Sequence, residues 1–117
     1  MKFEFDNNIP IYIQIVEQLK IYIISGKLKS GEKLPSVREL AIITKVNPNT
    51  MQKALGELED LNLIFTERTN GKFVTENQEL IKEYRNKYAA KLSKKYVESM
   101  KNIGFESQDI LKFLERE

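Results

Sequence analysis

Hydrogen-bonding and basic side chains gather at the start of one predicted helix, at Asn49, Thr50, Gln52 and Lys53. Amide groups can pair with base edges and an ammonium group with a phosphate, so this cluster is suited to contact a nucleic acid. The carboxylates of the same helix lie towards its other end, at Glu57, Glu59 and Asp60. This order opposes the helix dipole, which favours anions at the start. Charge order alone fits a solvated face as well as a polyanion-binding face.

Two helix starts surround this cluster. Ser36 and Glu39 have the spacing of a capping box. Asn47 is a favoured N-cap, and Pro48 suits the first helical position because its missing amide hydrogen would be unpaired there anyway. Apolar residues then recur on one helical face, at Met51, Ala54, Leu55, Leu58 and Leu61. The pattern predicts two short abutting helices, one at about 37–44 and one starting at residue 48.

A β-hairpin is predicted directly after these helices. Strand-forming runs occupy residues 63–68 and 72–75, with Asn70-Gly71 between them. Asn-Gly predicts a two-residue turn, in which both central positions have positive φ. The unit therefore reads helix, turn, helix, hairpin, which is a winged helix-turn-helix. Arg68 and Lys72 are expected to flank the wing tip, where a phosphate backbone would pass.

Further helices are predicted on both sides of this unit. Residues 10–25 form an amphipathic helix that Gly26 can end, and residues 78–100 form a long helix. Gly104 breaks the long helix, and Ser107 can cap a last short helix. We predict a mostly α fold with a small β-hairpin, in which residues 1–76 form a winged helix-turn-helix DNA-binding domain and residues 77–117 a short helical hairpin for dimerisation.

The predicted C-terminal hairpin has more apolar surface than the small first domain can cover, so self-association is expected. The residues that we assign to the dimer interface are Ile81, Tyr84, Tyr88, Leu92, Tyr96, Ile110, Leu111 and Leu114. A packed core or interface is the commoner meaning of such a stripe, although its tyrosines could also line a ligand cavity.

Composition excludes several classes of protein. The 117 residues include no cysteine and no histidine, which removes disulfides, thiol chemistry, the usual zinc ligands and the commonest general base. We expect no cofactor, no metal and no enzymatic activity. No apolar run reaches the ~20 residues that span a bilayer, and the start lacks the pattern of a signal peptide, so we expect a cytoplasmic protein. Between Lys27 and Lys53, six cations face two anions, so the positive charge concentrates on the helix-turn-helix.

Three runs carry a family resemblance: LPSVRELA at 34–41, VNPNT at 46–50 and GKFV at 71–74. Together they resemble the DNA-binding domain of bacterial GntR-family transcription regulators, over roughly residues 9–75. The Asn-Pro-Asn-Thr helix start and the short C-terminal segment are most similar to the YtrA subfamily. Asn62 stands where the family usually has glycine, and asparagine tolerates the left-handed conformation that this turn needs.

The resemblance implies a homodimeric transcription regulator that binds a palindromic operator in double-stranded DNA, and we predict a repressor. In the subfamily it also implies control of a transporter operon. The residues that we assign to DNA contact are Ser36, Arg38, Asn47, Asn49, Thr50, Gln52, Lys53, Arg68, Asn70, Gly71 and Lys72. Of these, the family motif itself implies Arg38, Asn49, Thr50, Gln52 and Gly71.

Two other functions stay open from the sequence. A winged helix can serve as a protein-protein interaction module without DNA-binding function, and its affinity would then lack a steep salt dependence. The protein could also be a ligand-gated sensor with an unknown effector. The tail of about 40 residues is short for the usual pocket of several hundred cubic ångströms.

Overall fold

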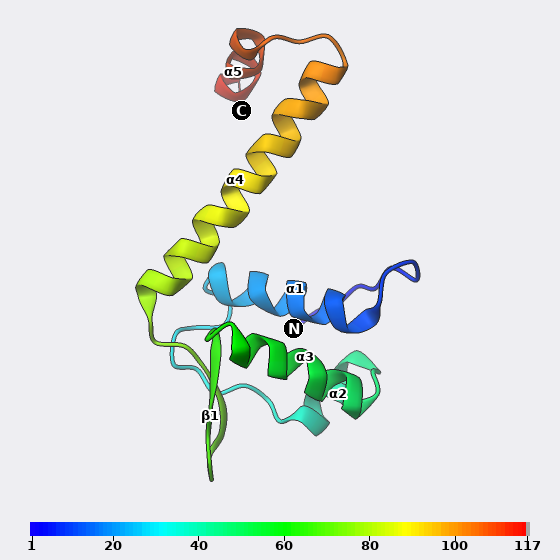
Figure 1. Cartoon of the computed structure of the whole chain (residues 1–117), viewed down its shortest axis with the longest axis vertical. Coiled ribbons are helices and arrows are strands. Elements are labelled where there is room, and N and C mark those ends of the chain that lie inside the picture. Colours follow the sequence, from blue (N-terminus) through cyan, green and yellow to red (C-terminus); the bar gives the residue numbers. More distant parts are fainter. Residues whose placement is uncertain (117) are drawn as a thin grey trace. The chain divides into compact units, whose positions relative to one another are not determined.

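The computed structural model describes residues 1–116. The elements follow the order α1 (Ile11–Ile24), α2 (Val37–Thr44), α3 (Pro48–Asp60), β1 (Ile64–Glu67), β2 (Gly71–Val74), α4 (Gln78–Asn102) and α5 (Ser107–Glu115), as Figure 1 shows. They form two compact units, Met1–Lys82 and Glu83–Glu117. The mostly helical fold with one hairpin is thus confirmed, and the first turns of α4 belong to the first unit.

Both predicted helix starts are confirmed. The Ser36 hydroxyl accepts a hydrogen bond from the Glu39 amide at 3.1 Å, while the Glu39 carboxylate accepts one from the Ser36 amide at 3.0 Å. At the start of α3, the Asn47 side chain accepts a hydrogen bond from the Asn49 amide at 2.8 Å. Lys45 ends α2 in the left-handed conformation, with φ of 58°. The turn between the two helices is therefore held by local bonds at both ends.

The core of the first unit is built around α3. Its apolar face is buried against α1, α2 and β1, and Figure 1 shows α1 and α3 side by side. The fully buried side chains of α3 are Met51, Ala54, Leu55 and Leu58, and those of its neighbours include Ile15, Leu19, Ile23, Leu40 and Ile64. Leu61, predicted on the same face, is only half-buried because it is the C-cap residue of the helix.

The wing is an antiparallel pair in which Ile64 faces Val74 and Glu67 faces Gly71. The predicted two-residue turn at Asn70-Gly71 is wrong. Residues 68–70 form the connection, and the Asn70 amide donates to the Glu67 carbonyl. Among residues 68–71, Gly71 alone has positive φ, at 104°. A three-residue connection, closed by the hydrogen bond between Asn70 and Glu67, joins the strands instead. The Asn70 side chain supports it by donating to the Glu67 carboxylate at 3.1 Å.

A third extended segment lies beside β2. The Leu34 amide donates to the Lys72 carbonyl at 2.8 Å, and the Val74 amide donates to the Glu32 carbonyl at 2.9 Å. These bonds attach residues 32–34, which lead into α2, to strand β2 of the wing. The sequence predicted an extended link here, but it did not reveal the partner because the pairing joins residues far apart in the chain.

The N-terminal residues run along α1 and are held by its side chains. The Gln14 side chain accepts a hydrogen bond from the backbone amide of Asp6 and donates one to the Asp6 carbonyl. The Gln18 side chain makes the same two bonds with the backbone of Glu4. Tyr22 does the same with Lys2 through its hydroxyl. The three side chains lie one helical turn apart, so they meet alternate residues of the segment.

The C-terminal unit contains most of α4 and all of α5. Among the residues assigned to the dimer interface, Ile81, which belongs to the first unit, is only 4% exposed and Ile110 only 3%, so both are already buried within one chain. Tyr84 and Tyr88 are half-buried. The rest of the predicted interface set is exposed, namely Leu92, Tyr96, Leu111 and Leu114.

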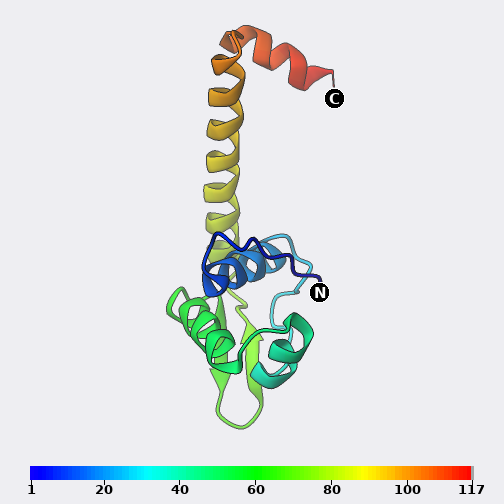
Figure 2. The ribbon, with the colours of Figure 1, turned by 90° about the vertical axis from the view of Figure 1, so that its right-hand side faces the viewer.

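The last helix differs from the prediction at its start. Ser107 is its first residue, not its cap: Glu106 is the N-cap, and its amide donates to the Asp109 carboxylate at 3.1 Å. Gly104 makes the turn before it with φ of 102°, and α5 then leaves the line of α4 (Figure 2). Among the described residues, no helix combines the length and the apolar character needed to cross a membrane.

Asn62 should limit the stability of the turn between α3 and the wing, because it has φ of 63°. We expect Asn62→Val to lower the free energy of unfolding by about 1–2 kcal/mol, since a side chain branched at Cβ fits the left-handed region poorly. Asn62→Gly should preserve or raise the stability. Urea unfolding measures both. Asn86→Val, on an exposed turn of α4, is the control and should change little because the two residues have similar helix propensities.

Candidate nucleic-acid interface

The outer face of α3 is open to solvent. Asn49, Gln52 and Lys53 are exposed and Thr50 is half-buried, while the apolar residues between them face the core. Asn47 is exposed as well, but its side-chain oxygen is used as the cap of α3. The amide-rich first turns that the sequence singled out are therefore presented outward by the burial of the opposite face.

A groove of about 360 Å³ lies between the start of α2 and the wing. Several of the residues assigned to DNA contact line it, namely Ser36, Arg68, Asn70, Gly71 and Lys72. Arg38 is exposed in the first turn of α2 but does not line the groove. Segments from different parts of the sequence thus meet here, which no local motif could predict.

Lys33 also lines this groove and was not among the predicted contact residues. A Cβ atom built on Gly71 would lie 3.2 Å from Lys33 Cε, so the aliphatic part of Lys33 crosses the wing directly over that glycine. The only sequence signal for Lys33 was the local excess of cations. Its position at the wing follows from the pairing of residues 31–34 with β2.

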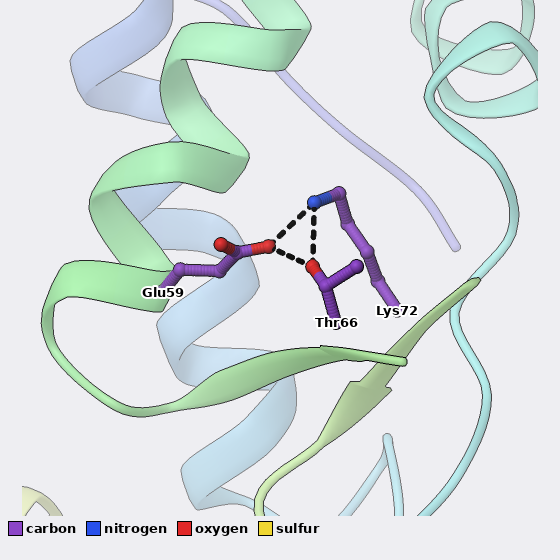
Figure 3. A network of polar contacts seen from close by, with 3 residues as sticks. All are labelled: Glu59, Thr66 and Lys72. Atoms are coloured by element: carbon purple, nitrogen blue, oxygen red, sulfur yellow. Dashed lines mark hydrogen bonds and ion pairs between the residues drawn. The ribbon is translucent and has the colours of Figure 1, made fainter. Parts of the chain in front are cut away.

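Lys72 does not point into solvent at the wing tip. Its ammonium group lies 2.5 Å from Glu59 Oε1 on α3 and donates to the Thr66 hydroxyl at 3.0 Å (Figure 3). The Thr66 hydroxyl in turn donates to the same carboxylate oxygen. The prediction that Lys72 flanks the tip as a phosphate contact therefore needs correction: its charge is neutralised within the chain, where it joins the wing to α3.

Two carboxylates of this region are held in the ionised form. The pKa of Glu59 is lowered first by its hydrogen bond from Lys72 and then by that from Thr66. The pKa of Glu39 is lowered mainly by the backbone and side-chain hydrogen bonds of Ser36. Both carboxylates accept hydrogen bonds inside the fold, so they act as structural acceptors at the two edges of the candidate interface.

Comparison with known proteins decides the family. The profile of bacterial regulatory proteins of the gntR family matches residues 11–74. The chain belongs to this family. It is 39% identical over 111 residues to the uncharacterised HTH-type transcriptional regulator YhcF of Bacillus subtilis, covering 95% of this chain and 92% of that protein. The HTH-type transcriptional repressor YtrA of Bacillus subtilis is 52% identical over 68 residues, 58% of this chain and 52% of YtrA, which supports the YtrA-like assignment.

Solved structures support the same family fold. A GntR family transcriptional regulator from Listeria monocytogenes superposes with a TM-score of 0.87 at 37% identity, covering 97% of this chain and 99% of that one. The crystal structure of AraR(DBD) in complex with operator ORX1 matches with a TM-score of 0.59 at 28% identity, over 64% of this chain and 96% of that one. The winged helix of this chain is thus the GntR-type DNA-binding fold, and the likeness to the Listeria protein includes the C-terminal helices.

Removal of the Glu59 charge should weaken the attachment of the wing in a pH-dependent way. A lowered folded-state pKa means that the network adds stability above the ordinary glutamate pKa of 4.5 and loses it as the pH falls through the folded-state value. We expect Glu59→Gln to cost at most about 1 kcal/mol near pH 7, because the Glu59 side chain is still 33% exposed. Urea unfolding at a series of pH values measures this difference.

The difference in unfolding free energy between the wild-type protein and the Glu59→Gln variant should shrink below about pH 4.5, because Glu59 of the wild-type protein then becomes protonated and neutral like the glutamine. Glu57→Gln, on the same helix but outside the network, is the control. A difference that stays constant from about pH 7 to about pH 3 would contradict this role of Glu59.

Proposed function

We propose that this protein is a homodimeric, sequence-specific DNA-binding regulator that represses transcription. The observation that carries the proposal is the exposed outer face of α3, where Asn49, Gln52 and Lys53 stand at the start of the helix. In helix-turn-helix proteins, the first turns of the recognition helix contact base edges in the major groove. Support also comes from the relatives, one of which is a repressor by name and another of which was crystallised with its operator.

On this proposal, the contacts divide between bases and backbone. Asn49 and Gln52 approach base edges, and Gln52 can pair bidentately with adenine. Arg38 and Arg68 are exposed cations that approach phosphates from α2 and the wing. Ser36 and Asn47 fix the helix starts through their caps, and Gly71 lets the wing approach closely.

The C-terminal helices supply the dimer contact on this proposal. Large apolar side chains remain uncovered there, with Leu92 65% and Leu111 61% exposed. A two-fold dimer would place one α3 in each of two successive major grooves, so the operator would be a palindrome with half-sites about 10 base pairs apart or a multiple of that. From the YtrA likeness we further propose that the regulated genes encode a transporter.

The alternative of a protein-protein interaction module makes a different prediction about salt. If α3 binds DNA, the logarithm of the affinity falls with the logarithm of salt concentration, by about 0.9 for each phosphate neutralised. If the same face binds a protein, affinity for DNA is weak and no such slope exists. A wild-type titration of random duplex DNA by fluorescence anisotropy separates the two.

Arg38→Ala should weaken binding to both random DNA and a duplex selected from a random pool. We expect the salt slope to fall by about one, because one phosphate contact is lost while the fold stays intact. Lys94→Ala on α4 removes the same charge from the other unit and should leave the slope unchanged. Unchanged affinity of the Arg38 variant, with an unchanged unfolding curve, would exclude α2 from the interface.

Leu92→Glu should convert the dimer into a monomer, because a carboxylate would then be buried in the proposed apolar contact. Sedimentation velocity measures the oligomeric state, and affinity for the selected palindrome should fall with it. Lys91→Glu, at the neighbouring exposed position, is the matched control and should stay dimeric. A dimeric Leu92 variant would place the contact elsewhere.

A further inference from the structure

One close contact joins the early turns of α1 and α3. The ammonium group of Lys53 lies 3.8 Å from the ring centroid of Tyr12. Other lysine-tyrosine contacts are wider, 5.8 Å for Lys27 over Tyr22 and 5.5 Å for Lys87 over Tyr84. An ammonium group over an aromatic face is attracted to the π-electrons of the ring, and the attraction weakens with distance. The Lys53 contact therefore restrains a side chain that would otherwise move freely.

The direction of this restraint distinguishes Lys53 from its neighbours. Tyr12 belongs to α1, which lies beside α3 (Figure 1). The contact therefore draws the ammonium group of Lys53 towards the α1 side of the outer face. Asn49 and Gln52 are on the same outer face and make no such contact with α1 among the interactions that the structure describes. Lys53 is still exposed, so its remaining N–H groups are available to a ligand.

We propose that Tyr12 is a positioning residue that holds Lys53 for a phosphate of the DNA backbone, at the edge of the surface that reads bases. This inference rests on the proposed DNA binding. A free lysine loses much rotamer entropy when it is fixed, so a lysine already held by a ring binds a phosphate at a smaller entropic cost. A phosphate contact carries no sequence information, which leaves base recognition to Asn49 and Gln52.

The test compares full-length variants of both residues. Tyr12→Leu removes the ring face, Tyr12→Phe keeps it, and Lys53→Ala removes the charge. Each is titrated against the selected duplex and against random duplex DNA over a range of salt, and urea unfolding reports the stability of each variant. Lys27→Ala is the matched control for Lys53→Ala, because it removes the same charge from a lysine-tyrosine contact at the other end of α1.

We expect Lys53→Ala to weaken binding to both duplexes equally and to lower the salt slope by about one. Tyr12→Leu should weaken both by about two- to tenfold, the cost of ordering one rotamer-rich side chain on binding. Tyr12→Phe should bind like the wild-type protein, and Tyr12→Leu should have no further effect when Lys53 is already alanine. The control variant Lys27→Ala should leave the salt slope unchanged.

Other results would overturn the inference. Equal losses from Tyr12→Leu with and without Lys53 would mean that the ring acts only on the packing of α1. Tighter binding by Tyr12→Leu would mean that the ring keeps Lys53 away from DNA. A Lys53→Ala loss confined to the selected duplex would make Lys53 a base contact. If the wild-type protein binds neither duplex in a salt-dependent way, the proposed function itself fails, and these comparisons separate that result from the others.

Discussion

Burial of one face of α3 is the constraint on which the rest of the first unit depends. Met51, Ala54, Leu55 and Leu58 are fully enclosed by α1, α2 and β1. Because a helix has a fixed period, enclosing these positions leaves only one orientation for the remaining ones. Asn49, Gln52 and Lys53 must then face outward. The hydrophobic effect, which stabilises the fold, thus also sets the direction of the polar groups that we propose contact DNA.

The carboxylates at the end of α3 would repel a polyanion bound to the same surface. At Glu59 this repulsion is reduced, because its carboxylate accepts hydrogen bonds from Lys72 and Thr66 of the wing. One interaction therefore has two effects: it neutralises a carboxylate near the candidate interface and it attaches the hairpin to α3. A lysine that the sequence placed among ligand contacts is used instead to hold the wing in position.

The chain divides its tasks between its compact units. The first unit has a filled core and exposes mainly polar groups on α3, whereas the second exposes large apolar side chains such as Leu92 and Leu111. Burial of such side chains releases free energy in proportion to the apolar area removed from water, which is the driving force for the proposed association of copies. This division fits a family in which the winged helix recurs in chains of very different length, since the chain spans 92% of YhcF but 19% of an arabinose metabolism repressor.

The sequence by itself determined the starts of α2 and α3, the buried and exposed faces of α3 and the left-handed conformation of Asn62. Those features depend on residues three or four positions apart, as with Ser36 and Glu39, or on one residue, as with Asn62. The family motifs added the fold class because several local spacings had to agree at once.

Only the tertiary structure decided the partners of Lys72, the position of Lys33 over Gly71, the contact of Tyr12 with Lys53 and the burial of Ile81. It also replaced the expected turn at Asn70-Gly71 by a longer one. Each of these features joins residues from different elements or depends on how strands align. Their geometry is set by the packing of the whole unit, and no local pattern encodes it.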